Sequence, residues 1–305
     1  MPLPDGTPAR LMVITAHPVD AFDNSGGTCA EHVGQGDHVT AIMCTSGVNT
    51  HNERLHDELR KAEADRDPQV MQESTQEYAQ RKRKEAEQSL GCFGITDVVV
   101  LPYDDGRYDI QPQMVDDLEE LICDRKPHLI MQQNPRDGLA QFEDHAIIGV
   151  ATSHAIARAS RPHYGKPRAP WEPVEVYYLG VYGVNAYALS DNSMRPDVFV
   201  DVTKHYKAKV QAHQHIASQG QNIGWGQKRI EAIEGHCGIF AGVSYAEAFV
   251  RARVPVFTTL PINARRYEDL KLTSAERARK NHQLLGAFVR EADGSYAWGI
   301  DPAKV

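Results

Sequence analysis

A histidine and an aspartate suited to binding a divalent metal stand three positions apart in the segment Ala16-His17-Pro18-Val19-Asp20, directly after an apolar run. Imidazole nitrogen and carboxylate oxygen suit a zinc-type ion, which commonly takes three protein ligands and leaves one position for water. By itself the pair also fits an ordinary turn in which the aspartate caps a helix. A metal site therefore requires a third ligand from another part of the chain.

His145 is the best candidate for the third ligand, because it opens a predicted helix directly after the apolar run LIMQQNP. Asp144 beside it could orient a ligand histidine through a hydrogen bond to the second ring nitrogen. A helix start capped by Asp144 is the simpler alternative, but it leaves the histidine without a role. We expect His17, Asp20 and His145 to meet at one divalent metal.

Apolar runs typical of buried strands precede these residues. The run LMVITA (11–16) ends at His17, the segment GGTCAEHVGQG (26–36) is compatible with a short helix, and HVTAIMCTSG (38–47) is a second apolar run. Strand, helix and strand in this order predict a right-handed parallel crossover. Ligands of such sheets bind beyond the carboxyl ends of the strands, and the pair His17 and Asp20 would lie at that edge.

The alternation of strands and helices continues to about residue 160. Residues 48–92 are highly charged and predict two helical stretches with a break near Asp67-Pro68. Strands are expected at ITDVVVLP and PHLIMQQ, and helices at QMVDDLEELICDRK and EDHAIIGVATSHAIARA. Further strands are expected at 174–183 and 197–203, and helices at 204–219 and 274–292. The pattern predicts an α/β fold with a parallel-dominated sheet and helices on both faces.

Composition narrows the class of protein. The chain has 305 residues, of which 41% are hydrophobic and 24% charged, so that it can form an ordinary core. A net charge of −8 argues against nucleic acid as a partner, since phosphate binding needs a basic face. Five scattered cysteines fit reduced thiols, and no apolar run reaches the length of a signal or membrane segment. We expect a cytoplasmic protein that does not bind membranes.

Two longer motifs carry a resemblance to a known family. The segments AHPVDAFDNSGG and FEDH resemble the motifs AHPDDE, with its following glycine pair, and HPDH of the PIG-L/LmbE-like family of metal-dependent N-deacetylases. The similarity continues through LICDRKPHLIMQQNP, KAKVQAHQHIASQ and GVSYAEAF, and covers roughly residues 10–252. It implies a Rossmann-like α/β sandwich, with a catalytic domain at 1–252. The remainder, 253–305, would be a C-terminal extension packed on the same domain.

The resemblance also implies a metal and a reaction. His17, Asp20 and His145 match the family's three ligands for zinc or another divalent metal. Family members hydrolyse the amide of N-acetylglucosamine conjugates or of related N-acyl amines. The resemblance therefore implies a hydrolase acting on a small N-acyl substrate, and it leaves a homo-oligomer open.

The departures from the family fall on the groups that transfer protons. Val19 stands at the position of the family's general base, at what we expect to be a loop edge near water, and Ala21 replaces the following glutamate. Phe142 replaces the leading histidine of the second motif. Lys82, flanked by Arg83, matches an arginine that contacts substrate in some relatives. The expected substrate-binding residues are Lys82, Arg83, Phe142, Asp144 and His215.

Another group must then supply the base. His51, just past the second apolar run, is the preferred candidate, and Asp105 and Asp23 are others, although residues of these types are more often solvated or capping residues. Three hypotheses follow. The chain is a hydrolase with a non-standard base, a metal-dependent enzyme of another type such as a lyase, isomerase or C–C hydrolase, or a silent metal-binding protein.

Overall fold

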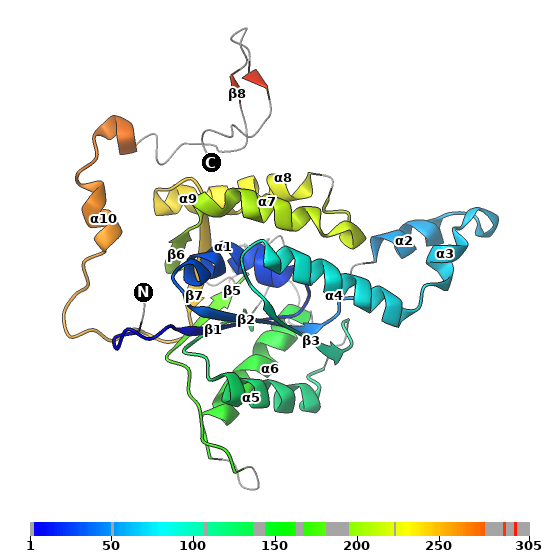
Figure 1. Ribbon diagram of the computed structural model, residues 1–305, viewed down its shortest axis with the longest axis horizontal. Coiled ribbons are helices and arrows are strands. Elements are labelled where there is room, and N and C mark those ends of the chain that lie inside the picture. Colours follow the sequence, from blue (N-terminus) through cyan, green and yellow to red (C-terminus); the bar gives the residue numbers. More distant parts are fainter. Residues whose placement is uncertain are drawn as a thin grey trace.

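A seven-stranded sheet forms the centre of the molecule (Figure 1). The computed structural model describes residues 3–49, 52–106, 109–136, 144–162, 167–180, 195–222, 224–277, 289–290 and 296–297. The strands are β1 (Arg10–Thr15), β2 (His38–Thr45), β3 (Asp97–Tyr103), β4 (Leu129–Gln133), β5 (Glu175–Leu179), β6 (Val198–Asp201) and β7 (Ala246–Arg251).

The order of the strands is β3-β2-β1-β4-β5-β7-β6. The five strands from β3 to β5 pair in parallel, and β7 pairs antiparallel with both β5 and β6. The structure therefore confirms the predicted parallel-dominated sheet. The chain moves outward from β1 to β3 on one side and from β4 to β5 on the other, which is the order of a Rossmann-like sheet.

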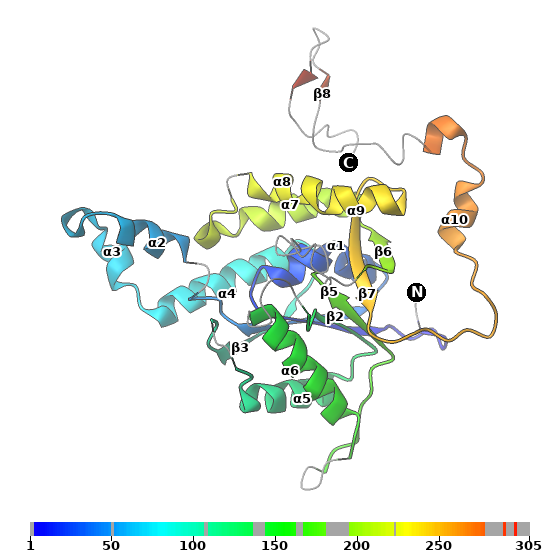
Figure 2. The same ribbon diagram turned by 180° about the vertical axis from the view of Figure 1, so that it is seen from behind.

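Helices cover both faces of the sheet, as predicted (Figures 1 and 2). On one face lie α1 (Asp20–Gly34), α4 (Thr75–Gly91) and α7 (Tyr206–Gln214), and on the other α5 (Pro112–Arg125) and α6 (Asp144–Ala159). The strand period of two sends Leu11 and Val13 into the first layer, and Met12 and Ile14 into the second. An apolar core on each face of the sheet therefore holds the strands, and with them the strand ends, in place.

Shorter elements make up the rest of the described structure. They are α2 (Glu53–Arg60), α3 (Pro68–Gln72), α8 (Trp225–Ala232), α9 (Glu234–Ala241), α10 (Ala264–Asp269), the pair β8 (Val289–Arg290) and β9 (Tyr296–Ala297), and 3-10 helices at Glu63–Asp65, Thr203–His205 and Ala217–Gln219. No helix among the described residues has the length and apolar character needed to cross a membrane. The five cysteines are free thiols, and all except Cys92 are buried.

Three differences from the sequence-based expectation have physical causes. Helix α1 begins at Asp20, six residues before the glycine pair, because Ala21 and Phe22 already bury an apolar face. Strand β7 and the helices α8 and α9 were not predicted, because their short segments show no clear period. The expected helix at 274–292 is wrong in part, since Val289–Arg290 forms a strand that pairs with Tyr296–Ala297.

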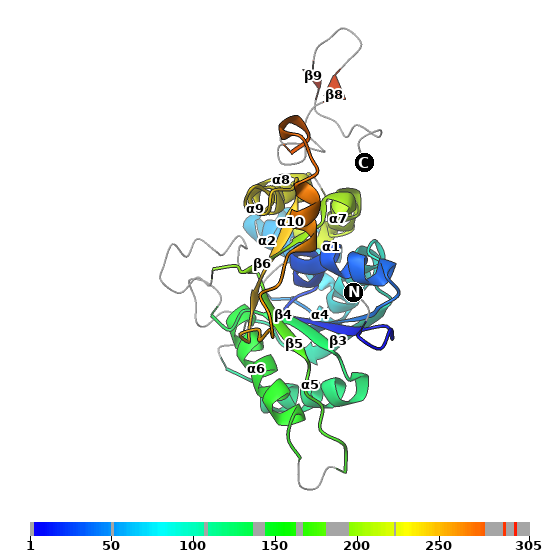
Figure 3. The same ribbon diagram turned by 90° about the vertical axis from the view of Figure 1, so that its left-hand side faces the viewer.

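The described part of the C-terminal extension is mostly exposed. Residues 253–277, called the C-terminal arm below, follow β7 and run beside the domain (Figures 1 and 3). Most of its side chains are exposed. Ion pairs join Arg253 to Glu172 at 2.8 Å and Arg265 to Asp201 at 2.5 Å. The arm is therefore tied to the domain by charge rather than by an apolar core.

Candidate metal centre

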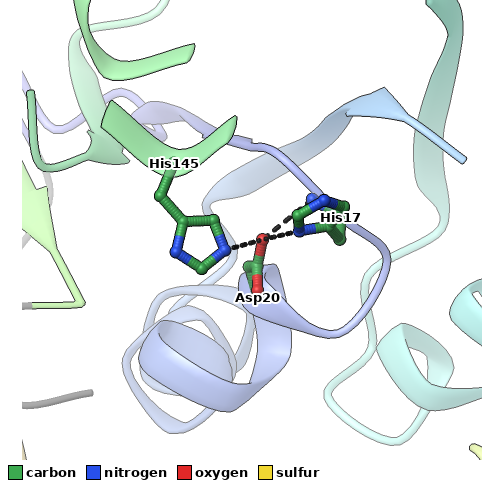
Figure 4. A group of neighbouring side chains, drawn as sticks. All are labelled: His17, Asp20 and His145. Carbon is green, nitrogen blue, oxygen red and sulfur yellow. Dashed lines mark hydrogen bonds and ion pairs between the residues drawn. The ribbon is translucent and has the colours of Figure 1, made fainter. Parts of the chain in front are cut away.

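The carboxyl ends of β1 and β4 position the residues singled out in the sequence. These strands are neighbours, yet the chain leaves β1 toward α1 on one face and leaves β4 toward α6 on the other. Such a reversal opens a crevice between the strand ends. His17 lies in the turn after β1, Asp20 begins α1, and His145 is the second residue of α6. All three side chains therefore face the same crevice (Figure 4).

The distances among these three side chains fit a tetrahedral metal. Asp20 Oδ2 lies 3.4 Å from His17 Nδ1 and 3.3 Å from His145 Nε2, and the two rings lie edge to face with centroids 5.3 Å apart. Two donors at about 2.0–2.1 Å from a tetrahedral zinc ion are about 3.3–3.4 Å apart. Two imidazole nitrogens and one carboxylate oxygen are also the donors that zinc takes. The residues present therefore fit a zinc-type ion.

Hydrogen bonds hold the Asp20 carboxylate in place. Its Oδ2 atom accepts from the backbone N–H of His17 at 2.8 Å and from Nε2 of Gln133 at 3.2 Å. Burial alone would raise the pKa of Asp20, but the two neighbouring histidines hold it well below its usual value. Gln133, the last residue of β4, was missed by the sequence analysis. The signal for it was a polar residue at the end of an apolar strand.

Asp144 orients His17 rather than its chain neighbour His145. Its Oδ2 atom lies 3.2 Å from His17 Nε2 and accepts from the backbone N–H of Gly106 at 2.8 Å. Burial alone would lower the pKa of His17, but the bonds to Asp144 and Asp20 raise it. A histidine held by a carboxylate on one ring nitrogen presents the other to a metal, an arrangement common in zinc sites.

Asp105 lies close to His17 and Asp144, and all three side chains are buried. One donor atom from each of His17, Asp105 and Asp144 falls within 4.8 Å of the others. The backbone N–H of Asn49 donates to both carboxylate oxygens of Asp105, at 2.9 and 3.1 Å. The structure thus brings Asp105 beside the candidate metal ligands, at the edge where the sequence suggested a substitute base.

Lys82 reaches the same edge from α4. Its side chain is almost fully buried, and Nζ donates to the backbone oxygen of Gly47 at 2.7 Å. Burial lowers the pKa of Lys82 to about 8. Gly47 has a φ of +64°, and a Cβ atom there would stand 3.2 Å from both Lys82 Nζ and the ring of His17. A buried ammonium group therefore lies next to the turn that carries the candidate ligand His17.

Val19 does not lie at a loop edge near water, which corrects the expectation from the sequence. Only 7% of its surface is exposed, and it belongs to the apolar core beneath α1. It precedes the first residue of that helix, and its side chain makes no capping hydrogen bond. An apolar side chain thus fills the position of the family's base.

Other sequence-predicted residues are placed elsewhere or not described. Arg83 points to solvent and its Nε contacts Glu87 at 2.9 Å, so the structure does not bring it to the site. His215 lies half-buried at the end of α7, outside both groups of ligand-type side chains. His51 and Phe142 lie outside the described residues.

A buried cluster of charges explains the other family-like motifs. Lys209 on α7 donates to Glu234 at 2.6 Å and to Glu247 at 2.7 Å. Glu247 also accepts from the backbone N–H groups of Gly27 and Thr28, at 2.9 and 2.7 Å. The motifs KAKVQAHQ and YAEAF thus meet the glycine pair inside the molecule and hold α1 in place.

Asp23 belongs to this cluster and not to the metal site. Its carboxylate contacts Arg229, and His213 Nε2 lies 3.3 Å from it. Burial alone would raise the pKa of Asp23, but Arg229 and His213 lower it to about 2. The sequence-based suggestion that Asp23 replaces the base therefore does not fit the structure, because its charge is held by a buried cation.

The α/β fold described above is shared by several solved structures. One solved structure with this fold is 4-carboxy-2-hydroxymuconate hydratase GalB from Pseudomonas putida KT2440 (TM-score 0.67, 18% identity, 83% of this chain and 100% of that chain). Another is N,N'-diacetylchitobiose deacetylase from Pyrococcus horikoshii (TM-score 0.64, 20% identity, 82% and 87%). At these identities the similarity concerns the fold alone.

A family model also matches part of the sequence. The model of the PIG-L family, described as GlcNAc-PI de-N-acetylase, matches residues 12–156, which include all three candidate ligands. The match covers just under half of the chain. It is 23% identical over 196 residues to 1D-myo-inositol 2-acetamido-2-deoxy-alpha-D-glucopyranoside deacetylase 1 of Catenulispora acidiphila. That alignment covers 59% of this chain and 59% of the relative.

Proposed function

We propose that the chain is a metal-dependent hydrolase that cleaves the amide of an amino-sugar conjugate or of another small N-acyl amine. The observation that carries this proposal is the convergence of His17, Asp20 and His145 in a PIG-L family domain. Relatives named as deacetylases of an acetamido sugar support the substrate class. Zinc or another divalent metal held by these residues would polarise the acyl oxygen and acidify a water molecule.

Asp105 is the residue to which we assign the proton transfer, because Val19 cannot perform it. Its carboxylate is buried, and one of its oxygen atoms lies within 4.8 Å of donor atoms of His17 and Asp144, whereas Asp144 itself contacts the ring nitrogen of His17 and would orient that ligand. Asp105 takes a proton from the attacking water as the water oxygen bonds to the acyl carbon. When the C–N bond breaks, the same proton passes to the amine nitrogen. His51, which the structure does not describe, is the second candidate.

Lys82 is assigned to substrate binding. A buried ammonium group beside the ligand turn favours negative charge, either on the substrate or developing on the acyl oxygen. Its position on α4 matches the residue expected from the sequence. The same charge would attract a substrate that carries a carboxylate.

A second function is favoured by the buried valine together with this cation. An enzyme that has no carboxylate at the position of Val19 and keeps a buried ammonium suits a metal-dependent lyase, in which water adds across a C=C bond next to a carboxylate. The hydratase with the same fold supports this alternative. In that reaction Asp105 would transfer the proton of the added water, and no amide would be cleaved.

Metal content and turnover of two matched pairs of variants test the proposal. His145→Ala should lose stoichiometric zinc, whereas His154→Ala, exposed on the same helix, should keep it. Asp105→Asn should keep zinc and lower turnover by about 10²–10⁴. Asp104→Asn, at the exposed neighbouring position, should leave turnover unchanged.

The substrates decide between the reactions. Amine release from an N-acetylglucosaminyl inositol and from N,N'-diacetylchitobiose measures amide hydrolysis, and the absorbance of 4-carboxy-2-hydroxymuconate measures hydration. Amine release that depends on zinc and on Asp105 supports the hydrolase. Hydration alone replaces it with the lyase. Zinc binding without turnover of any of the three leaves a metal-binding protein.

A further inference from the structure

We propose that the C-terminal arm packs against the domain of a second copy of this chain, and that its partner on that copy is the exposed face of α9. The inference concerns assembly and does not depend on the reaction that the metal centre performs.

The arm exposes large apolar side chains to an extent that the domain does not. The exposed fractions are 89% for Val254, 94% for Val256, 56% for Phe257, 93% for Leu260, 85% for Ile262, 57% for Tyr267 and 73% for Leu270. Single exposed apolar residues are common on proteins, but seven along one short segment are not. Such a segment gains by covering these side chains with another surface.

The exposed area suits a stable dimer. Complete burial of an apolar side chain of this kind covers about 60–120 Å² of accessible surface. This range follows from a transfer free energy of about 1.5–3 kcal/mol at about 25 cal/mol per Å². Scaled by their exposed fractions, the seven residues together offer roughly 330–660 Å² on each arm, and the surface that they cover contributes a similar area. Two arms exchanged across a twofold axis would therefore bury an area of the standard size or more.

The charges of arm and domain are complementary. The arm, residues 253–277, contains five Lys or Arg and three Asp or Glu residues, a net charge of +2. Residues 1–252 contain 24 Lys or Arg and 35 Asp or Glu residues, a net charge of −11. Complementary charge steers association and selects the orientation of partners. An acidic domain is thus the partner that a basic apolar arm would select, and this chain supplies one.

The domain presents a matching apolar patch. Ile239 and Phe240 on α9 are exposed to 69% and 59%, respectively. Helix α9 packs beside β7 and β6, and β6 is the edge strand of the sheet. The arm's own ion pair, Arg265 with Asp201, lies at that same edge strand. An arm arriving from a second copy would find an apolar patch there, next to the edge strand that carries Asp201.

Two pairs of variants test the proposal in the full-length protein. Light scattering coupled to size exclusion, over a wide range of protein concentration, should give a dimer or a larger closed oligomer for the native chain. Leu260→Asp with Ile262→Asp should weaken self-association by about tenfold or more, since it buries charges in an apolar contact. The control, Thr258→Asp with Thr259→Asp, adds the same charge at exposed polar positions of the same arm and should weaken it far less.

The second surface has its own test. Phe240→Asp on α9 should weaken self-association to a similar degree as the changes in the arm, while zinc content and the melting temperature stay unchanged. A native chain that is monomeric at all concentrations overturns the proposal, as does an oligomer that none of these variants affects. Sedimentation with vesicles of anionic phosphatidylserine, abolished by the arm variants in a monomeric chain, would assign the arm to a membrane surface instead.

Discussion

Replacing Val19 by aspartate tests the site and the core at once. The side chain of Val19 is 7% exposed within the apolar cluster under α1, so the change removes an apolar contribution of about 1.5 kcal/mol. A carboxylate placed there without a partner costs a further 1–3 kcal/mol, roughly. An aspartate just before a helix also stabilises it by capping. The gain here is only about 0.5 kcal/mol, because residue 19 has helical dihedral angles (φ −78°, ψ −36°) and not the extended ones of a typical cap. We expect Val19→Asp to lower the free energy of unfolding by about 2–4 kcal/mol.

The assay is urea denaturation of the native chain, Val19→Asp and Val19→Asn, each with excess zinc and with chelator. Asparagine keeps the shape of aspartate without the charge, so the difference between the two variants isolates the buried carboxylate. If the hydrolase proposal holds, the folded fraction of Val19→Asp should also hydrolyse an N-acetyl sugar faster than the asparagine variant. If the unfolding free energies of Val19→Asp and the native chain agree within about 0.5 kcal/mol, Val19 is not buried as described. Equal turnover of the two variants would refute a restored base.

Three further predictions concern the packing of α1 and two buried lysines. Gly27→Ala should lower the free energy of unfolding by about 1–3 kcal/mol, because its Cβ would stand 2.5 Å from Val202. Gly34→Ala, on the same helix but in open space, should raise it by up to about 1 kcal/mol, and equal effects in thermal melts would contradict the close packing. Lys82→Met should stabilise the protein at pH 7 by up to about 3 kcal/mol, because a pKa lowered to about 8 means that the folded state binds the proton less tightly than the unfolded chain. The difference in unfolding free energy between Lys82→Met and the native chain should shrink as the pH rises from 8 toward 10.5, where Lys82 is deprotonated in the folded and the unfolded chain. A constant difference across this range in urea titrations would disprove the prediction. Lys209→Met leaves two buried carboxylates without their cation and should cost about 3–5 kcal/mol of unfolding free energy; a loss below about 1 kcal/mol would show that the cluster does not hold α1.

The candidate ligands could be found in the sequence because of how parallel sheets are built. His17 and Asp20 follow one apolar run and His145 follows another, and parallel strands bring their carboxyl ends to one edge. Each motif is a local feature of the sequence, and the pairing of the strands in the sheet brings the two motifs together. The glycine pair was recognised as a motif, but its reason was not visible in the sequence. That reason is the close approach of Phe93 to Gly26 and of Val202 to Gly27, which no local pattern encodes.

The sequence by itself determined the alternation of strands and helices, the resemblance to a family and the candidate donor set, since these depend on residue types and short periods along the chain. Only the tertiary structure decided which groups meet across long separations. Asp144 turns toward His17, 127 positions away, rather than toward its neighbour His145. Likewise, Val19 is buried although it looked solvent-facing, since α1 begins directly after it and turns it into the core. Side-chain partners and burial depend on how whole layers pack, and packing is a property of all the elements together rather than of any one segment.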